Sequence, residues 1–352
     1  MRRFRGKVYG ETVGKLRKRL LSVLFVFYGL FLLGCSPKYY PISSAKPLLP
    51  ELFGHHFMTE DGTRLPLTFW SNTQPPQAIV IAVHGFNDYQ RAFDLPADFL
   101  AKNNIYVYAY DQRGFGEAAN RGAWLGGDRL QSDLLTLVNL VIQKHPTVPI
   151  YLLGDSMGGA VVTLAATAFE APKIAGVILN APAVWGKQTF NSFYRVGLWL
   201  LAHTLPWMEV TGSGLKITVT DNIPLLRELS LDPLMIRETR IDALYGLVGM
   251  MDTALERAPL IKQPTLLVYG LKDEVIPQNS ICHFASQLTT DNKVIFYEHG
   301  YHFLLRDLDA QKVWQDIVDW IEGKTQFNEA LAISTCELND RKTSNAVSLL
   351  ND

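Results

Sequence analysis

The 352-residue chain has only three cysteines, which are too few for the disulfide framework of a small secreted domain. Cys282 falls in an apolar, helix-like stretch and is typical of a small core residue. A bridge between Cys282 and Cys336 stays open for a chain that folds in an oxidising compartment, although nothing in the spacing argues for it. Disulfides therefore do not define this fold.

Metal ligands and a long membrane-spanning run are also missing from the pattern. His55 and His56 are adjacent rather than helically spaced, and no cluster of His, Asp and Glu has ligand spacing. We therefore expect no metal and no cofactor. The apolar run Leu20–Leu33 has 14 residues, whereas a transmembrane helix needs ~20.

The amino terminus has the pattern of an export signal. Residues 1–19 contain eight Lys or Arg and one acidic residue, and the apolar run follows them. The run closes in Leu32–Ser36, which resembles a bacterial lipoprotein box in which Cys35 would be lipidated and become the first residue. An uncleaved membrane anchor is the alternative. Both interpretations tether the domain to a membrane of the bacterial cell envelope, outside the cytoplasm and with a periplasmic face expected.

Cleavage after residue 34 would change the charge of the chain. The full sequence has a net charge of −1, but residues 1–34 hold eight of its 33 basic and one of its 34 acidic residues. The remaining 318 residues carry a net charge of −8 and show no basic stripe, so we expect no nucleic-acid partner. Anchoring must then come from lipid rather than from attraction to anionic headgroups. The sequence indicates no particular protein partner.

Apolar strands alternate with helical patterns over most of the remaining chain. The strands are expected at Ala78–Val83, Ile105–Tyr110, Val148–Leu153, Ile174–Leu179, Thr265–Tyr269 and Lys293–Tyr297. This alternation predicts an α/β fold with a mostly parallel sheet and helices on both faces. We assign the segments as a signal peptide 1–34, a linker 35–50, an α/β core 51–181 and 259–323, a cap insertion 182–258 and a mobile polar tail 324–352.

Ser156 lies in Gly154–Gly158, a G-x-S-x-G motif between an apolar strand and a segment of small apolar residues, 159–166. A strand, a tight turn and a buried helix form the context of a nucleophile elbow. The glycines permit a strained turn and close packing of the helix on the strand. We therefore interpret Ser156 as a nucleophile.

A serine hydroxyl needs a base to take its proton, and the base needs an orienting acid. In hydrolases with this elbow the chain order is serine, acid, histidine. Asp273 follows a predicted strand and His302 lies in the loop after the last one, so we favour them as acid and base. Glu274 and His299 remain the alternatives for these two roles.

The strand Ala78–Val83 ends in His84, Gly85 and Phe86. In this arrangement the residue after such a His-Gly pair and the residue after the nucleophile supply the two oxyanion-hole amides, here those of Phe86 and Met157. Each such dipole can lower the barrier by about 3 kcal/mol. His84 lies on a different strand from the nucleophile, so we expect it to brace the loop rather than to act as base.

Taken together, these residues resemble the monoacylglycerol lipase and lysophospholipase branch of the α/β-hydrolase superfamily, which borders the serine aminopeptidases. The matching segments, within roughly Phe57 to Glu322, are His84–Phe86, Tyr110–Gly116, Gly154–Gly159, Gly270–Pro277 and Gly300–His302. Asp155 stands where the family often has histidine, and Asn87–Gln90 replaces the family's usual glutamate-histidine. In this fold Asp111–Gly114 is expected to brace the elbow rather than to bind substrate.

The resemblance implies a helical cap and a chemistry. Segment 182–258 contains no strand that fits the parallel sheet and is rich in large apolar residues, which would give an acyl chain a dry groove or would bury the cap on the core. Apolar spacing over 247–255 predicts an amphipathic helix there. The implied function is a membrane-tethered serine hydrolase that cleaves lipid esters of monoacylglycerol or lysophospholipid type through an acyl-enzyme. An aminopeptidase, a thioesterase or a lipid-binding lipoprotein without activity is the alternative.

Overall fold

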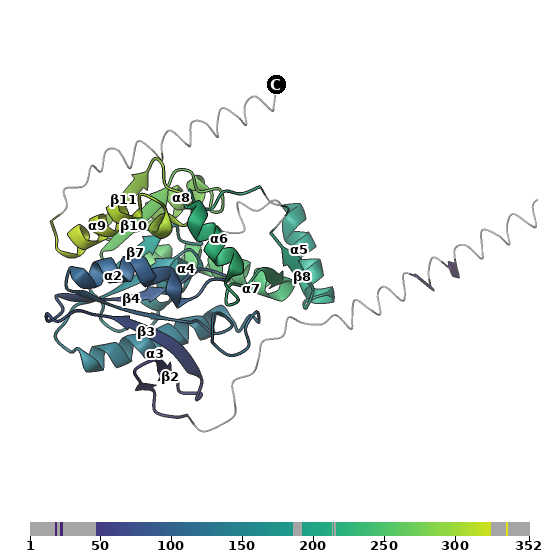
Figure 1. Ribbon diagram of the computed structural model, residues 1–352. Helices are drawn as coiled ribbons and strands as arrows, with labels where there is room; N and C mark the ends of the chain where they lie inside the picture. Colours follow the sequence, from purple (N-terminus) through teal and green to yellow (C-terminus); the bar gives the residue numbers. More distant parts are fainter. Residues whose placement is uncertain are drawn as a thin grey trace, which may run out of the picture.

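The computed structural model describes residues 18, 19, 22, 23, 47–185, 192–212, 214, 216–324 and 336. Cys35 and nearly all of the predicted signal peptide and tail lie outside these residues. The described part is built on one twisted sheet with helices on both of its faces (Figure 1). No helix within it is long and apolar enough to cross a bilayer.

The central sheet has nine strands in the order β1-β2-β3-β5-β4-β6-β7-β10-β11. Neighbouring strands are parallel from β5 to β11 and antiparallel from β1 to β5. Their bounds are β1 Glu51–Leu52, β2 His56–Met58, β3 Arg64–Trp70, β4 Ala78–Val83, β5 Ile105–Tyr110, β6 Ile150–Asp155, β7 Gly176–Asn180, β10 Thr265–Gly270 and β11 Asn292–Tyr297. The predicted fold class is confirmed, and β6 extends two residues further than expected, up to the nucleophile.

Alternation along the strands produces two apolar layers, one on each face of the sheet. In β4, Ile79 and Ile81 pack into one layer, while Val80 and Ala82 pack into the other. The first layer is covered by α3, α4, α7 (Ile241–Arg257) and α8, and the second by α2 and α9. The bounds of the core helices are α2 Asp94–Lys102, α3 Gly127–Lys144, α4 Met157–Ala166, α8 Gln278–Gln287 and α9 Ala310–Ile321, with 3-10 turns η1 Gln90–Phe93, η2 Ala258–Leu260 and η3 Leu304–Arg306.

The chain between β7 and β10 leaves the sheet and forms separate elements on one side of the molecule (Figure 1). These are α5 Ser192–Thr204, β8 Glu209–Thr211, α6 Ile223–Leu231, β9 Glu238–Arg240 and α7 Ile241–Arg257. The strands β8 and β9 pair only with each other, as an antiparallel ribbon. Helix α7 packs on α4 and α5, and it confirms the amphipathic helix expected over 247–255. We refer to α5 through α7 as the cap.

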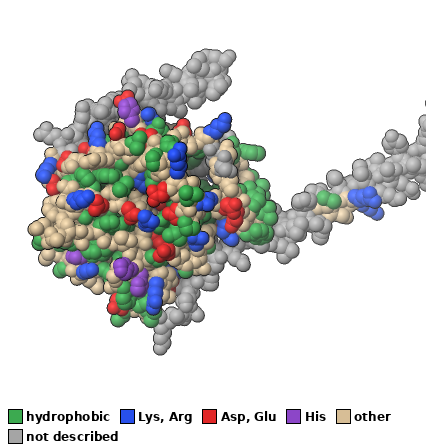
Figure 2. Space-filling model, viewed as in Figure 1, with side chains coloured by type: hydrophobic (Ala, Val, Ile, Leu, Met, Phe, Trp, Pro, Cys, Tyr) green, Lys and Arg blue, Asp and Glu red, His purple; other side chains and the backbone are tan. Residues whose placement is uncertain are grey.

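Several large apolar side chains of the cap face outward instead of lining its interior. Phe193 is 80% and Tyr194 68% exposed on α5, and Trp207 is 55% exposed just beyond it. Figure 2 shows hydrophobic side chains gathered over the edge where Figure 1 places α5 and β8. The sequence predicted that these residues line a dry groove or form the core of the cap. Instead, these three side chains lie on the outer surface.

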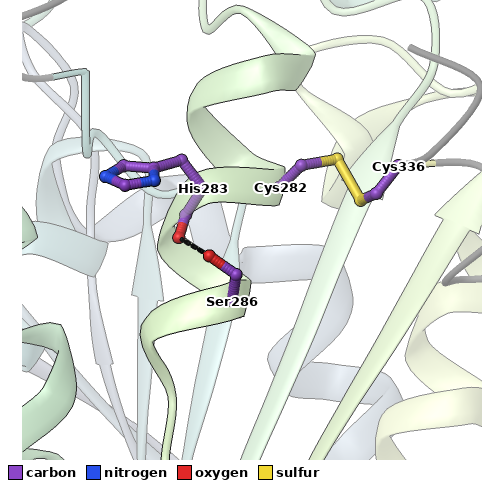
Figure 3. Close-up of a disulfide and its surroundings, with 4 residues drawn as sticks. All are labelled: Cys282, His283, Ser286 and Cys336. Atoms are coloured by element: carbon purple, nitrogen blue, oxygen red, sulfur yellow. Dashed lines mark hydrogen bonds between the residues drawn. A yellow bond between two sulfur atoms is a disulfide. The ribbon is translucent and has the colours of Figure 1, made fainter. Parts of the chain in front are cut away.

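Cys282 and Cys336 form a disulfide, with their Cα atoms 5.6 Å apart (Figure 3). Cys282 lies on α8 and is mostly buried. Cys336 belongs to the segment predicted as a polar tail, and the bond ties this point of the chain to helix α8 of the α/β core. The bridge that the sequence left open is thus present in the structure.

Candidate active site

The turn at Ser156 has the backbone strain that the glycine pattern predicts. Ser156 joins β6 to α4 with φ +50° and ψ −113°, a region that residues with a side chain rarely adopt. A Cβ on Gly154 would lie 2.5 Å from the carbonyl oxygen of Gly158, so only glycine permits this approach. The Ser156 N–H donates to Asn180 O (2.9 Å) and its carbonyl accepts from Ala183 N (2.8 Å), which holds the strained turn in place.

Ser156, His302 and Asp273 form one hydrogen-bonded chain. His302 Nε2 lies 3.0 Å from Ser156 Oγ, and His302 Nδ1 lies 2.8 Å from Asp273 Oδ2. The other carboxylate oxygen of Asp273 accepts from the Val275 and Ile276 amides at 2.7 and 3.0 Å, so the side chain cannot rotate away from the imidazole. The structure brings the three sequence-predicted residues together from three separate loops.

The two alternatives for the acid and the base face elsewhere. Glu274 accepts a hydrogen bond from the Thr218 amide of the cap (2.7 Å) instead of approaching His302. His299 is exposed at the end of β11. Geometry therefore selects Asp273 and His302 over their neighbours.

The electrostatics of His302 suit a group that gains a proton during a reaction. Burial alone would lower the pKa of His302, but the hydrogen bond and charge of Asp273 outweigh it, and the charge of Asp155 adds to them. The pKa of His302 is therefore raised above its usual value. Arg306 acts in the opposite direction. A carboxylate behind the imidazole stabilises the imidazolium that forms when the serine loses its proton.

The loop expected to carry an oxyanion amide lies directly beside the nucleophile. A Cβ built on Gly85 would be 3.4 Å from Ser156 Cβ, so the turn at Gly85 and Phe86 borders the serine. Met157 is the first residue of α4, and the first amides of a helix have no acceptor within it. The Phe86 and Met157 amides thus lie on two segments that meet at Ser156.

His84 fixes the peptide unit that ends in the Phe86 amide. Its Nδ1 lies 2.8 Å from Gly85 O, and its Nε2 accepts from the Gln112 amide at 3.0 Å. This pair of bonds assigns the proton to Nδ1. Because the Gly85 carbonyl and the Phe86 N–H belong to one planar peptide, holding the carbonyl also orients the amide. Burial keeps His84 neutral by lowering its pKa to about 4.

The segment Asp111–Gly114 braces the surroundings of the site, but not in the expected way. Asp111 accepts from the Gln90 and Glu117 amides, and Gln112 bonds to both the ring and the carbonyl of His84. Arg113 pairs with Asp133 and with Asp61 of the β2–β3 turn. The segment therefore supports the oxyanion loop, by which we mean His84–Tyr89 after β4, and the β2–β3 hairpin. It does not support the elbow, because β5 lies beside β4 and not beside β6.

Sequence reasoning missed two buried groups next to the triad. Asn180 at the end of β7 donates to Asp155 Oδ1 (2.6 Å), which satisfies a carboxylate buried one position before the nucleophile. Asp88 and Arg306 form a buried ion pair between the oxyanion loop and the segment after His302. A sequence signal existed, because a lone arginine after Leu304 and Leu305 in a buried segment needs a partner. The sequence did not indicate which acidic residue pairs with Arg306.

Within the described residues, no group of three or more His, Cys, Asp or Glu side chains is arranged to hold a metal ion. Cys35, the predicted lipidation site, lies outside those residues. The groups that the structure does assemble are a serine, an imidazole and a carboxylate, with the segments that carry the Phe86 and Met157 amides beside the serine. This set performs acyl transfer through a covalent serine intermediate.

Comparison with known proteins identifies relatives over most of the chain. The profile of the family Hydrolase_4, described as serine aminopeptidase, S33, matches residues 74–309. A monoacylglycerol lipase of Mycolicibacterium smegmatis is 24% identical over 271 residues, covering 76% of this chain and 96% of that relative. A monoglyceride lipase of Rattus norvegicus is 28% identical over 277 residues, covering 76% of this chain and 90% of the relative.

Solved structures show the same fold. A soluble variant of the Saccharomyces cerevisiae monoglyceride lipase, crystallised with a substrate analogue, has a TM-score of 0.65 and 21% identity, and the match covers 83% of this chain and all of that one. The monoacylglycerol lipase of Paleococcus ferrophilus has a TM-score of 0.62 and 21% identity, with 74% of this chain and 99% of that one covered. At this level of identity the likeness concerns the fold.

Proposed function

Since the chain belongs to the Hydrolase_4 family and is a serine hydrolase of monoacylglycerol lipase type, we propose that it cleaves carboxylic esters of lipids at Ser156 while tethered to a membrane. The observation that carries the catalytic part is the hydrogen-bonded chain from Ser156 through His302 to Asp273. The family supports the reaction class, and the cap and the amino terminus support the lipid and membrane parts.

The first half of the proposed reaction acylates the serine. His302 Nε2 takes the proton of Ser156 Oγ as the oxygen attacks the ester carbonyl, and Asp273 stabilises the imidazolium. The Phe86 and Met157 amides donate to the oxyanion. When the tetrahedral intermediate collapses, His302 returns its proton to the departing alcohol, and the acyl group remains on Ser156.

The second half releases the acid. A water molecule takes the place of the alcohol, and His302 removes its proton as the oxygen attacks the acyl-enzyme carbonyl. The same two amides hold the second oxyanion. Collapse of this intermediate returns the proton to Ser156 Oγ and frees the carboxylic acid, so the enzyme regains its starting protonation state.

Two observations favour a lipid ester over other acyl substrates. Relatives that match three quarters of this chain are named as monoacylglycerol and monoglyceride lipases. The cap exposes large apolar side chains on α5 and after it, which a lipid surface would remove from water.

Membrane tethering rests on the amino terminus, and the disulfide supports the compartment. The basic segment, the apolar run and Cys35 together form the lipoprotein-type signal. Disulfides persist in oxidising compartments such as the bacterial periplasm, and the Cys282–Cys336 bond agrees with export. Maleimide labelling of denatured protein from cells, with and without prior reduction, measures this: Cys282 and Cys336 should label only after reduction. Labelling without reduction would contradict the periplasmic location.

The substrate class is tested with p-nitrophenyl esters of two to twelve carbons beside aminoacyl anilides. Each methylene that enters an apolar groove contributes about 0.8 kcal/mol, so kcat/KM should rise about fourfold per carbon until the groove is full. Ser156→Ala is the control for background hydrolysis. A flat chain-length profile would indicate a general esterase, and faster turnover of anilides would indicate an aminopeptidase.

A further inference from the structure

A buried ion pair joins two loops of the active site that are far apart in sequence. Arg306 Nη2 lies 2.5 Å from Asp88 Oδ2, and the two side chains are only 6% and 5% exposed. Asp88 comes two residues after Phe86 in the oxyanion loop. Arg306 comes four residues after His302, at the end of η3. The pair therefore connects the loop that carries the Phe86 amide to the segment that carries the base, His302.

Each member of the pair is also fixed to its own loop. Asp88 Oδ1 accepts from the Tyr89 amide (2.8 Å), and the Asp88 amide approaches Gly85 O at 3.4 Å, which closes the turn around Phe86. The Arg306 guanidinium carbon lies 4.2 Å above the ring of Phe303, the residue after His302. A shift of either loop is therefore transmitted through the pair to the other.

The cap holds the same oxyanion loop from its other side. Asn87 O accepts from the Ile236 amide at 3.1 Å, and Asn87 Nδ2 donates to Thr239 Oγ1 at 2.7 Å. These bonds fix the loop to the cap, but not to the base. In the described part of the chain, the Asp88–Arg306 ion pair links the oxyanion loop directly to the His302 segment.

Stability alone does not account for two charges at this place. The cost of removing both charges from water roughly cancels their attraction, so a buried pair is weak evidence for a stabilising role. Its other effect is geometric, because a buried charge must stay with its partner. A nearby pair of the same residue types, Arg91 and Asp94, is 60% and 41% exposed and links residues only three positions apart.

We propose that Asp88 and Arg306 are positioning residues for ester hydrolysis: their ion pair sets the Phe86 amide relative to Ser156 and His302. This inference rests on the proposed hydrolysis at Ser156, but not on the lipid nature of the substrate. An oxyanion donor contributes only where negative charge develops, and a displacement of about 1 Å can reduce the rate by about 100-fold. The pair should therefore affect kcat rather than KM.

The test compares Asp88→Asn and Arg306→Met with Arg91→Met and Asp94→Asn as matched controls, all in the full chain. Turnover of p-nitrophenyl butyrate is divided by the concentration of active sites, which is measured by letting fluorophosphonate labelling run to completion. Unfolded protein is not labelled and therefore does not lower the kcat that is obtained. We expect Asp88→Asn and Arg306→Met to lower kcat about 10- to 100-fold with KM within about threefold. Affinity for a trifluoromethyl ketone, which forms a tetrahedral adduct, should fall in parallel. The controls should match the wild type, and Arg306→Lys should recover part of the loss.

The outcomes separate this inference from its premise. Absence of ester turnover in the wild type would contradict the proposed function itself. Normal kcat per labelled site, with only a lower melting temperature, would show that the pair is merely structural and would overturn the inference. A raised KM with normal kcat would also overturn it, because it would indicate substrate contact.

Single variants that leave a buried charge without a partner can fail to fold. The double variant Asp88→Asn with Arg306→Met removes both charges and avoids that cost. It should fold and still show the lowered kcat with a normal KM, because the link between the loops is absent. Full recovery of kcat in the double variant would contradict the positioning role.

Discussion

Acidification should destabilise this protein through His84. The side chain is 0% exposed, and burial lowers its pKa from 6.5 to about 4. Its Nε2 already accepts from the Gln112 amide, so a second proton would displace that bond. Between pH 6.5 and pH 4 the unfolded chain binds more protons at this position than the folded protein does. Stability must therefore fall as the pH falls through this window.

The size of the effect follows from the two pKa values. At about 1.4 kcal/mol per pH unit, His84 should reduce the free energy of unfolding by about 3 kcal/mol between pH 7 and pH 4. His84→Asn places an amide donor near Gly85 O but cannot titrate. At pH 7 the variant should be less stable by about 1–3 kcal/mol, because the Gln112 amide loses its acceptor. At pH 4 this deficit should have disappeared.

The measurement is urea unfolding of wild type and His84→Asn, followed by circular dichroism at pH 7, 6, 5 and 4 without reductant. The other titrating groups are common to both proteins, so the difference between the two free energies isolates His84. A difference that stays constant from pH 7 to pH 4 would refute the depressed pKa. It would also remove the argument that His84 is held neutral to orient the Phe86 peptide.

Three further substitutions test separate parts of the account. Asp155→Asn removes a charge that raises the pKa of His302, so the acid limb of the kcat/KM profile should move to lower pH; an unmoved limb would contradict that coupling. Gly158→Ala would place a Cβ against the carbonyl oxygen of Val83 in β4. The variant should lower the free energy of unfolding in urea by about 3 kcal/mol and abolish fluorophosphonate labelling. Wild-type values for both would show that the elbow tolerates a side chain. Cys35→Ser should abolish incorporation of a palmitate analogue, and equal incorporation would refute the lipoprotein signal.

The sequence was sufficient for the parts of the fold that local patterns determine. Apolar runs predicted β4 and β5 with the bounds that the structure has, because buried parallel strands are apolar on both faces. Ser156, Asp273 and His302 could be predicted because each follows a strand, and the ends of parallel strands meet at one edge of the sheet. Their geometry agrees with the roles assigned to them.

Contacts between distant segments could not be predicted in the same way. Nothing in the sequence pairs Asp88 with Arg306, 218 positions later, because many acids precede that arginine. The burial of the cap's apolar side chains was also predicted wrongly in part. Residue type alone predicts that Phe193 is buried, but in the structure it is exposed on the outer surface. Charge pairing and the direction of a helix face depend on tertiary packing, which residue type and spacing do not encode.

The central claim is an acyl-enzyme on Ser156, and trapping that intermediate tests it most directly. A long-chain p-nitrophenyl ester in molar excess over the enzyme should release a burst of nitrophenol equal to the amount of enzyme, and acid quenching followed by peptide mass spectrometry should locate the acyl group. One acyl group is expected on the peptide that contains Ser156, and neither burst nor adduct is expected in Ser156→Ala. An adduct on another residue, or a burst that survives in that variant, would contradict it.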